Sequence, residues 1–439
     1  MNSVVNKIVF ASIFTLSMLG TSRAEVEEDK IDIGDLNYVS SHQKMFEDGR
    51  KIFRFDSFGS EAFWGNQLRL HDAIKGEQNG GVGPGVSPKT ALSVGLKVDV
   101  AKLDRIMIDA IREGRGLDDP DTTLALLKKN AVVGLKGVFK NNKLTSIGIT
   151  CALCHSTVNN SFAPGIGQRL DGWPNRDLNV GAIVNLAPNK APLAQVLGVD
   201  EETVSRVLTS WGPGRYDAIL LMDGKAFRPD GKTGATLLPA AFGLAGVNLH
   251  TYNGWGSVPY WNAYVAVTQM HGQGTFYDPR LNDPIKYPLA VRNNFWNVRA
   301  KKDLVSSKLP ALHIYQLGLR APTPSKSTYD QRKAKRGKIL FEGKAQCIAC
   351  HVPPLYTEPG WNMHTGAEIG IDDFQALRSP DERYRTTPLK GLFTRKKGGF
   401  YHDGRFPTYR SVVEHYNEVK NLNLDEDEKV DLTEYLKSF

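Results

Sequence analysis

Apolar residues recur at helical spacing in several stretches of the chain. Helices are predicted over residues 101–114, 122–133, 330–341 and 425–437. The last of these begins with acidic residues, which favour a helix N-terminus. Residues 138–149 form two short runs on either side of two asparagines, a pattern typical of a β-hairpin. The sequence therefore predicts a mostly α fold with a small β-hairpin.

The first 24 residues follow a different pattern. Lys7 precedes a mostly apolar run over residues 8–19, and Ser22 and Ala24 place small residues before a cleavage point. These features predict a cleaved signal peptide and export to the periplasm. The alternative is an N-terminal membrane anchor, although the apolar run is short for a membrane-spanning helix. No later apolar stretch is long enough to span a membrane.

The charge balance is basic but not concentrated. The chain has 55 Lys and Arg against 47 Asp and Glu, a formal net charge of +8. No long Lys/Arg tract is present, so the sequence does not indicate nucleic-acid binding. A basic surface is compatible with an acidic redox partner.

All four cysteines fall into two copies of one pattern, C-x-x-C-H. The N-terminal motif is Cys151–His155 and the C-terminal motif is Cys347–His351. Four cysteines in an exported protein could instead form two disulfides, and a lone C-x-x-C could be a redox dithiol or half a zinc site. Neither alternative requires a histidine directly after the second cysteine, whereas covalent attachment of haem c does. We therefore predict two haems, bound by Cys151, Cys154, Cys347 and Cys350 and ligated by His155 and His351.

A faint internal repeat accompanies the two motifs. The stretch Pro239-Ala-Ala-Phe-Gly-Leu precedes His250–Gly254, and Pro388-Leu-Lys-Gly-Leu precedes Tyr401–Gly404. Each pair follows its own C-x-x-C-H motif. The pattern indicates two cytochrome c-like haem domains of common ancestry, although chance similarity of glycine-rich loops is the alternative.

The predicted domains meet at a proline-rich linker near residues 320–327. An N-terminal haem domain with long insertions would occupy residues 25–326. A C-terminal cytochrome c domain would occupy residues 327–439.

From Gly148 onward the chain resembles the dihaem cytochrome c peroxidase superfamily. Its members include bacterial dihaem peroxidases, the dihaem enzyme that matures the quinone of methylamine dehydrogenase, and the haem rubber oxygenases. The most specific segments are Thr387–Leu392, Phe400–Arg405 and Val412–Asn417. The N-terminal half matches more loosely, and residues 25–147 match nothing recognisable.

The resemblance implies a sixth iron ligand in the C-terminal domain. In the family this ligand is Met or Tyr, about fourteen residues after the histidine of an H-D/S-G motif. Counting from His402 leads to Tyr416, whereas the only methionine after the C-terminal motif is Met363. Ordinary packing of Tyr416, or ligation by its neighbour His415, are the alternatives.

The resemblance also implies an open site at the N-terminal haem. The peroxidases place a displaceable histidine in an Ile-Gly-His sequence, where this chain has Gln168. A glutamine is a poor iron ligand, so the sixth position is expected to be open or water-bound. The family's relay tryptophan corresponds to the stretch Tyr252–Trp255, which makes Trp255 a candidate relay residue or a core aromatic.

Two histidines are candidates for proton transfer at that haem. The peroxidases carry a Gln and then a Glu over the open face, and here the nearby sequence is Gln269-Met270-His271. His271 could move a proton at neutral pH, with His250 as a second candidate. Either could instead be structural, and the missing Glu argues against a true peroxidase.

The family often holds calcium between its domains through an asparagine side chain and backbone carbonyls. Asn179 has the corresponding spacing, with carbonyl partners expected near Lys397 and Gly399. A plain loop-capping role for Asn179 is the alternative.

The sequence thus predicts a periplasmic dihaem c-type cytochrome that couples electron transfer to haem-based oxidation, as a peroxidase-like oxidoreductase. Two other functions stay open: a pure electron carrier, and an oxygenase resembling the rubber oxygenases. The expected partners are a small redox protein or a quinol-linked electron donor or acceptor. Peroxide or oxygen is the candidate substrate.

Overall fold

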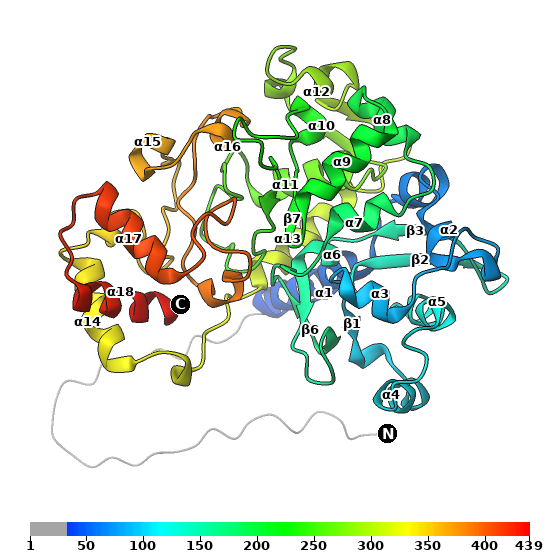
Figure 1. The fold of residues 1–439 in the computed structure, drawn as a ribbon, viewed down its shortest axis with the longest axis horizontal. Coiled ribbons are helices and arrows are strands. Elements are labelled where there is room, and N and C mark those ends of the chain that lie inside the picture. Colours follow the sequence, from blue (N-terminus) through cyan, green and yellow to red (C-terminus); the bar gives the residue numbers. More distant parts are fainter. Residues whose placement is uncertain (1–32) are drawn as a thin grey trace. The chain divides into compact units, whose positions relative to one another are not determined.

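The computed structural model describes residues 33–439 and is mostly helical, with 44% helix and small sheets (Figure 1). The prediction of a mostly α fold is therefore confirmed. The predicted signal peptide, residues 1–24, lies outside the described residues. Between residues 33 and 439, no helix combines the length and the apolar character needed to cross a membrane.

The first part of the described chain ends in a hairpin. Its elements are α1 (Ile33–Phe55), η1 (Ala62–Gln67), α2 (Leu70–Lys75), η2 (Glu77–Asn79), α3 (Pro88–Ser93), β1 (Val98–Asp99), η3 (Val100–Lys102), α4 (Arg105–Arg112), α5 (Pro120–Lys128), β2 (Leu135–Lys140) and β3 (Lys143–Ile149). Strands β2 and β3 pair antiparallel, which confirms the predicted hairpin. Asn141 and Asn142 both have positive φ, at 49° and 63°, as a two-residue type I′ turn requires.

Two predicted helices are shorter than their apolar pattern. Helix α4 begins at Arg105 because Asp104 caps it, accepting a hydrogen bond of 2.9 Å from the Met107 amide. Helix α5 ends at Lys128, two residues before Asn130 adopts a left-handed conformation with φ 53°. Local capping and backbone geometry therefore override the periodicity at these ends.

The middle of the chain follows the N-terminal motif. Its elements are α6 (Ala152–His155), β4 (Ser156–Val158), β5 (Ile166–Gly167), β6 (Arg169–Asp171), α7 (Val180–Asn185), α8 (Ala191–Leu197), α9 (Glu201–Trp211), β7 (Arg215–Tyr216), α10 (Leu220–Asp223), β8 (Thr236–Leu237), α11 (Val258–Tyr264), η4 (Val265–Gln269), β9 (Thr275–Tyr277), η5 (Pro279–Leu281), α12 (Pro288–Arg292), β10 (Asn297–Arg299), η6 (Ser306–Lys308) and α13 (Leu309–Gly318). Two clusters of buried apolar side chains form the core of residues 46–319, and Cys151 and Cys154 pack against different clusters.

The C-terminal part has its own apolar cluster, which runs from Phe341 to Phe439. Its elements are η7 (Lys326–Thr328), α14 (Gln331–Glu342), η8 (Cys347–Ala349), α15 (Gly366–Ile369), α16 (Phe374–Leu377), η9 (Leu392–Arg395), α17 (Tyr409–Val419) and α18 (Glu426–Lys437). Helices α14 and α18 confirm the two remaining helix predictions and lie side by side (Figure 1). A Cβ at Gly337 would lie 2.0 Å from the Asp431 carbonyl oxygen, so the close approach of these helices needs glycine there.

A fully buried ion-pair network, here called the Arg378 clasp, joins distant parts of the chain. The Arg378 guanidinium donates to the carboxylates of Asp217, at 2.9 Å, and Asp223, at 2.7 Å. All three side chains are 1% exposed. Because an unpaired charge at this depth is costly, the three residues must stay together. The proposed division at residue 326 separates Arg378 from both aspartates, while residues 42–439 form one compact unit.

The internal repeat has a structural counterpart in two loops. His250 pairs with Gly256 in one loop, and Phe400 pairs with Phe406 in the other, each as an isolated antiparallel bridge. Equivalent residues share left-handed backbones: Thr251 and Tyr401 have φ of 69° and 68°, and Gly254 and Gly404 have φ of 63° and 75°. This places Tyr252 and His402 at equivalent positions.

The two repeat loops also exchange backbone hydrogen bonds with the opposite half of the chain. The Leu237 amide donates to the His402 carbonyl at 2.7 Å, and the Arg385 amide donates to the Tyr252 carbonyl at 2.8 Å. Each loop is therefore held in part by the half of the chain that contains the other loop.

Candidate functional site

The N-terminal motif lies directly after the hairpin and forms the short helix α6. His155 Nδ1 lies 3.1 Å from the Pro239 carbonyl oxygen and donates its proton there in one tautomer. That tautomer leaves Nε2 with a free lone pair, as a metal-ligating imidazole needs. Burial lowers the pKa of His155, which keeps the ring neutral.

The chemistry of the cysteines favours haem attachment over the alternatives. The four cysteines are free, which does not support two disulfides. Burial raises the pKa of Cys151 and of Cys154 to about 12. A redox dithiol or a zinc thiolate needs a low thiol pKa. Buried thiols followed by a polarised histidine therefore fit thioether attachment best.

A cavity, here called the N-terminal cavity, has Tyr216 in its wall, and the Cys154 sulfur of this motif is close enough to raise the pKa of Tyr216. Apolar side chains from α8 and α9 form much of its wall, and its polar lining residues are Tyr216, Asp217, Gln269 and His271. Cys154 packs against the same apolar cluster as α8 and α9. An apolar wall with a few convergent polar groups is typical of a cofactor or small-molecule site.

His271 is held in the wall of the N-terminal cavity by aromatic contacts. Its ring stacks on Phe63 with centroids 3.6 Å apart and an interplanar angle of 17°. Trp64 meets it edge-on at 6.0 Å. Burial lowers the pKa of His271 to about 3, so the ring is neutral at physiological pH. Its lone pair is available to a proton, and the low pKa makes it a weak base.

Gln269 and Tyr216 face the same cavity and are hydrogen-bonded to each other. The Tyr216 hydroxyl donates to Gln269 Oε1 at 2.9 Å, and Gln269 Nε2 donates to Thr268 Oγ1 at 3.0 Å. The glutamine is thus fixed, with both ends of its amide engaged. The sequence analysis noted Gln269 but missed Tyr216 and Asp217. The segment that contains β7 and α10 has no recognisable motif, and only the fold brings these two residues to the cavity.

The other two predicted catalytic residues do not line the N-terminal cavity. His250 is 6% exposed, one ring nitrogen donates to the Val247 carbonyl at 3.0 Å, and burial lowers its pKa to about 4. Trp255 is 2% exposed and stacks on Trp261 with centroids 5.1 Å apart. Gln168, the residue expected in place of a distal histidine, is exposed. Of the three predicted catalytic residues, the structure therefore brings only His271 to the cavity.

Tyr252, rather than Trp255, makes a ring contact with the C-terminal half of the chain. Its ring meets His402 edge-on, with centroids 6.3 Å apart, and His402 in turn stacks on Tyr384 at 5.2 Å. His402 is 3% exposed and its pKa is lowered to about 4 by burial. The two equivalent loop residues thus form an aromatic contact between the halves of the chain.

The C-terminal motif forms the short helix η8. His351 Nδ1 lies 3.1 Å from the Tyr356 carbonyl oxygen, the same kind of contact that His155 makes. Burial lowers the pKa of His351 to about 4. Burial likewise raises the pKa of Cys347 to about 12. Both motifs therefore present a neutral imidazole with one nitrogen bound to a backbone carbonyl.

Tyr416 lies on α17 close to the C-terminal motif. Burial raises its pKa to about 12. A hydrogen bond from Tyr401 opposes this rise, and the nearby sulfurs of Cys347 and Cys350 add to it. His415 is already engaged, since one ring nitrogen lies 2.8 Å from the Ile369 carbonyl oxygen. Of these two neighbours, Tyr416 is the one beside the cysteines.

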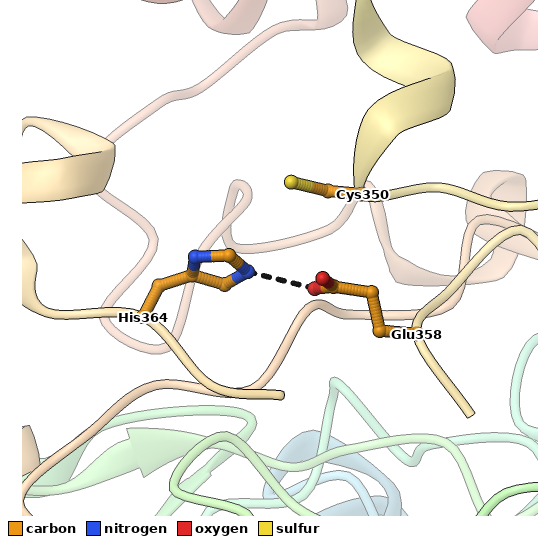
Figure 2. Close-up of side chains that lie close together, drawn as sticks. All are labelled: Cys350, Glu358 and His364. Carbon is orange, nitrogen blue, oxygen red and sulfur yellow. Dashed lines mark hydrogen bonds and ion pairs between the residues drawn. The ribbon is translucent and has the colours of Figure 1, made fainter. Parts of the chain in front are cut away.

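A cluster that the sequence did not reveal lies beside Cys350. The Sγ of Cys350, a carboxylate oxygen of Glu358 and a ring nitrogen of His364 lie within 4.8 Å of one another (Figure 2). His364 Nε2 lies 2.7 Å from Glu358 Oε2. The Cys350 sulfur and then Glu358 raise the pKa of His364 to about 9. Three such groups could hold a metal ion, but Cys350 belongs to a haem motif, and a thioether sulfur is a much poorer ligand than a thiolate.

The groups expected to hold calcium are engaged in other contacts. Asn179 Oδ1 caps α7, accepting from the Ala182 amide at 3.0 Å. The Lys397 carbonyl accepts from Arg176 Nη1 at 3.2 Å, and the Lys397 ammonium pairs with Asp177. Two cationic side chains at this place fit a calcium ion poorly. Calcium stays a prediction that this geometry disfavours.

No family model matches the chain. A curated relative, the methylamine utilization protein MauG of Methylorubrum extorquens, is 31% identical over 121 residues, which is 24% of this chain and 34% of that protein. The chain thus aligns with about a third of the length of this relative.

Two solved structures have partial likeness to the fold. One is a MauG-like protein associated with microbial copper homeostasis, with a TM-score of 0.32, 18% identity, and coverage of 48% of this chain and 75% of that chain. The other is the hydrazine synthase of Kuenenia stuttgartiensis, with a TM-score of 0.27, 18% identity, and coverage of 47% and 72%.

Proposed function

We propose that this chain, a member of the dihaem cytochrome c peroxidase superfamily, is a dihaem c-type cytochrome that couples electron transfer to haem-based oxidation. Its domains would be residues 25–326 and 327–439, each with one haem, and it would act in the periplasm after removal of residues 1–24. The observation that carries the proposal is the difference between the two motifs: one adjoins a cavity, and the other adjoins a buried tyrosine.

At the N-terminal motif, Cys151 and Cys154 would attach the haem and His155 would ligate the iron. The haem would supply a redox centre that gives electrons to a small oxidant such as peroxide or oxygen. The chain's own contribution is a wall that excludes bulk water, a fixed amide at Gln269, and a neutral base at His271 that can take a proton from the oxidant.

At the C-terminal motif, Cys347 and Cys350 would attach the second haem, and His351 and Tyr416 would hold its iron. Tyr416 would supply an anionic oxygen, a donor type that favours ferric iron. This haem would therefore store and relay electrons. The aromatic contact between Tyr252 and His402 lies on a route between the two halves.

A pure electron carrier is the second candidate, because the N-terminal cavity offers no free carboxylate. Its acidic lining residue, Asp217, is paired with Arg378. The missing carboxylate leaves His271 as the base, so an enzyme of this kind depends on that residue. In either case the partners would be a small redox protein or a quinol-linked donor or acceptor.

The experiment that separates the candidates starts from the full-length exported protein. Intact mass should exceed the mature chain by two haems, and the EPR spectrum of the oxidised protein should contain one high-spin and one low-spin ferric signal. Cyanide should convert only the high-spin signal to low spin, and it should do so without prior reduction of the protein. Two low-spin signals with no cyanide binding would reject the enzyme and favour the pure electron carrier.

A further inference from the structure

A second cavity, here called the central cavity, is lined by residues from both halves of the chain. It is lined by both copies of the sequence repeat, including Pro239 and Pro388. The Pro239 carbonyl is the group that accepts from His155. On the other side, the charge of Arg395, a lining residue, acts on His351. The central cavity is therefore adjacent to both haem motifs.

Three arginines gather around the central cavity. Arg385 and Arg395 line it, and Arg176 reaches the same place through the lining residue Tyr252, whose hydroxyl lies 3.5 Å from Arg176 Nη2. Arg176 and Arg395 are 6% and 7% exposed. This cluster could not be foreseen from the sequence, because Arg176 lies about 200 residues before Arg385 and Arg395.

The hydrogen bonds that these arginines donate within residues 33–439 all go to neutral oxygens. Arg385 Nε donates to the Thr251 carbonyl at 2.9 Å, and Arg395 Nη2 donates to the Pro388 and Lys390 carbonyls. Within residues 33–439, no ion pair joins any of the three to an acidic side chain. The Nε atoms of Arg176 and Arg395 are buried without a hydrogen-bond partner in the same range.

Other buried arginines of this chain are paired with carboxylates. Arg378 contacts Asp217 and Asp223, and the Arg169 Nε lies 3.1 Å from Asp99. The nearest acid to Arg176 in the sequence, Asp177, is taken by Lys97 and Lys397. The three-arginine cluster is thus an exception to the chain's own pattern.

Three buried guanidinium charges without an acidic partner are unfavourable, and a bound anion would stabilise them. Burial, and then the charge of Arg395, lower the pKa of Arg385 to about 10; burial also lowers the pKa of Arg395 to about 10, with Arg176 as a further repulsive charge. Buried charges in proteins are normally paired, and guanidinium groups bind carboxylates with two parallel hydrogen bonds. Two or more carboxylates in the central cavity would satisfy both requirements.

We propose that Arg176, Arg385 and Arg395 form the binding site for haem propionates, with the carboxylates drawn from the haems of both motifs. This rests on the proposed function, since it requires haem to be attached. A haem fixed at its vinyl edge through two cysteines has its propionates at the opposite edge, and those carboxylates are the acids that the cluster lacks. The guanidinium charges keep the propionates ionised and hold the potential of the attached haem above the value it would have without them.

The other titratable or charged groups that face the cluster are Tyr252, Tyr409, Arg215, Lys390, His250 and His351. None of them is a carboxylate. Loss of an arginine would therefore leave a propionate to take up a proton itself.

The test compares Arg385→Gln and Arg395→Gln with the wild-type holoprotein. Each variant should keep two haems by intact mass and pyridine haemochrome assay. Its midpoint potential should fall for at least one haem, and that potential should become pH-dependent between pH 5 and 8, whereas the wild-type potential should be nearly level there. Arg336→Gln, which removes an exposed arginine that pairs with Asp431, is the matched control and should leave both potentials unchanged.

Arg385→Lys and Arg395→Lys keep the proposal testable if the glutamine variants do not fold. A buried lysine loses its charge at lower pH than arginine, so the potential should match the wild type at neutral pH and fall at alkaline pH. Two haems with wild-type potentials and pH dependence in every foldable variant would overturn the propionate assignment alone. A chain that carries no haem would instead overturn the proposed function.

Discussion

The two C-x-x-C-H motifs are nearly alike in themselves and differ in what the rest of the chain places around them. Both histidines bind a backbone carbonyl at 3.1 Å, and both are kept neutral by burial. The N-terminal motif adjoins a cavity with a neutral His271 on its wall, whereas the C-terminal motif adjoins the buried phenol of Tyr416. If haem is attached as proposed, a five-residue motif specifies attachment and one ligand, and distant segments decide what faces the iron on its other side.

The largest expected effect is on the C-terminal haem. Tyr416→Phe removes the hydroxyl that is proposed to bind the iron. This haem should therefore change from low spin to high spin and begin to bind cyanide. EPR and absorption spectra of the oxidised protein measure the change. His415→Gln is the matched control, since His415 is already bound to the Ile369 carbonyl. Unchanged spectra in Tyr416→Phe would show that the two motifs differ for another reason.

The next effect is on the reactivity of the N-terminal haem. His271→Ala should slow the reaction with peroxide by about 10²-fold or more, the usual contribution of a positioned acid–base group. Stopped-flow absorption measures the rate. His250→Ala, a histidine outside the N-terminal cavity, should leave it nearly unchanged. Equal losses in both variants would indicate a general structural effect.

The pH dependence of the same reaction sharpens the assignment. Burial lowers the pKa of His271 to about 3, so its neutral form is present throughout the neutral range. The rate should stay level from about pH 8 to about pH 4 and decline only as the pH approaches 3. A decline centred near pH 6.5 would indicate a base with an ordinary histidine pKa.

The smallest expected effect is that of calcium removal. Arg176 and Lys397 already place positive charge where the family's calcium was expected, so a chelator should change neither haem spectrum. Metal analysis of the chelated and untreated protein provides the measurement. A stoichiometric calcium whose loss alters either haem would show that the cationic side chains do not replace it.

Local features of the fold were predictable from the sequence, and most of the site was not. The hairpin and helices α14 and α18 follow from turn residues, capping residues and apolar spacing, which act within a few residues. The haem motifs were recognisable because attachment needs a fixed short spacing. Tyr216 and Asp217 lie more than 50 residues from His271, and Arg176 lies about 200 residues from Arg385 and Arg395, and no local motif marks any of them.

Some expected site residues were placed elsewhere for a physical reason. Trp255 and His250 belong to the right segment, but the left-handed backbone at Thr251 and Gly254 turns that loop so that Tyr252 meets His402 instead. Sequence spacing located the loop but not the direction of its side chains. The likeness of the two repeat loops could be suspected from sequence, whereas their exchanged backbone hydrogen bonds could not.

The Arg378 clasp bears on how the protein behaves in concentrated salt. Dissolved ions screen charges that water can reach, over a distance of about 3 Å at 1 M, and they act far less on a pair buried as deeply as this one. A redox partner held on the basic exterior should therefore dissociate as ionic strength rises. The contact of Arg378 with Asp217 and Asp223 should persist under the same conditions. Salt should thus weaken any contact made through exposed charges while it leaves the packing held by the Arg378 clasp unchanged.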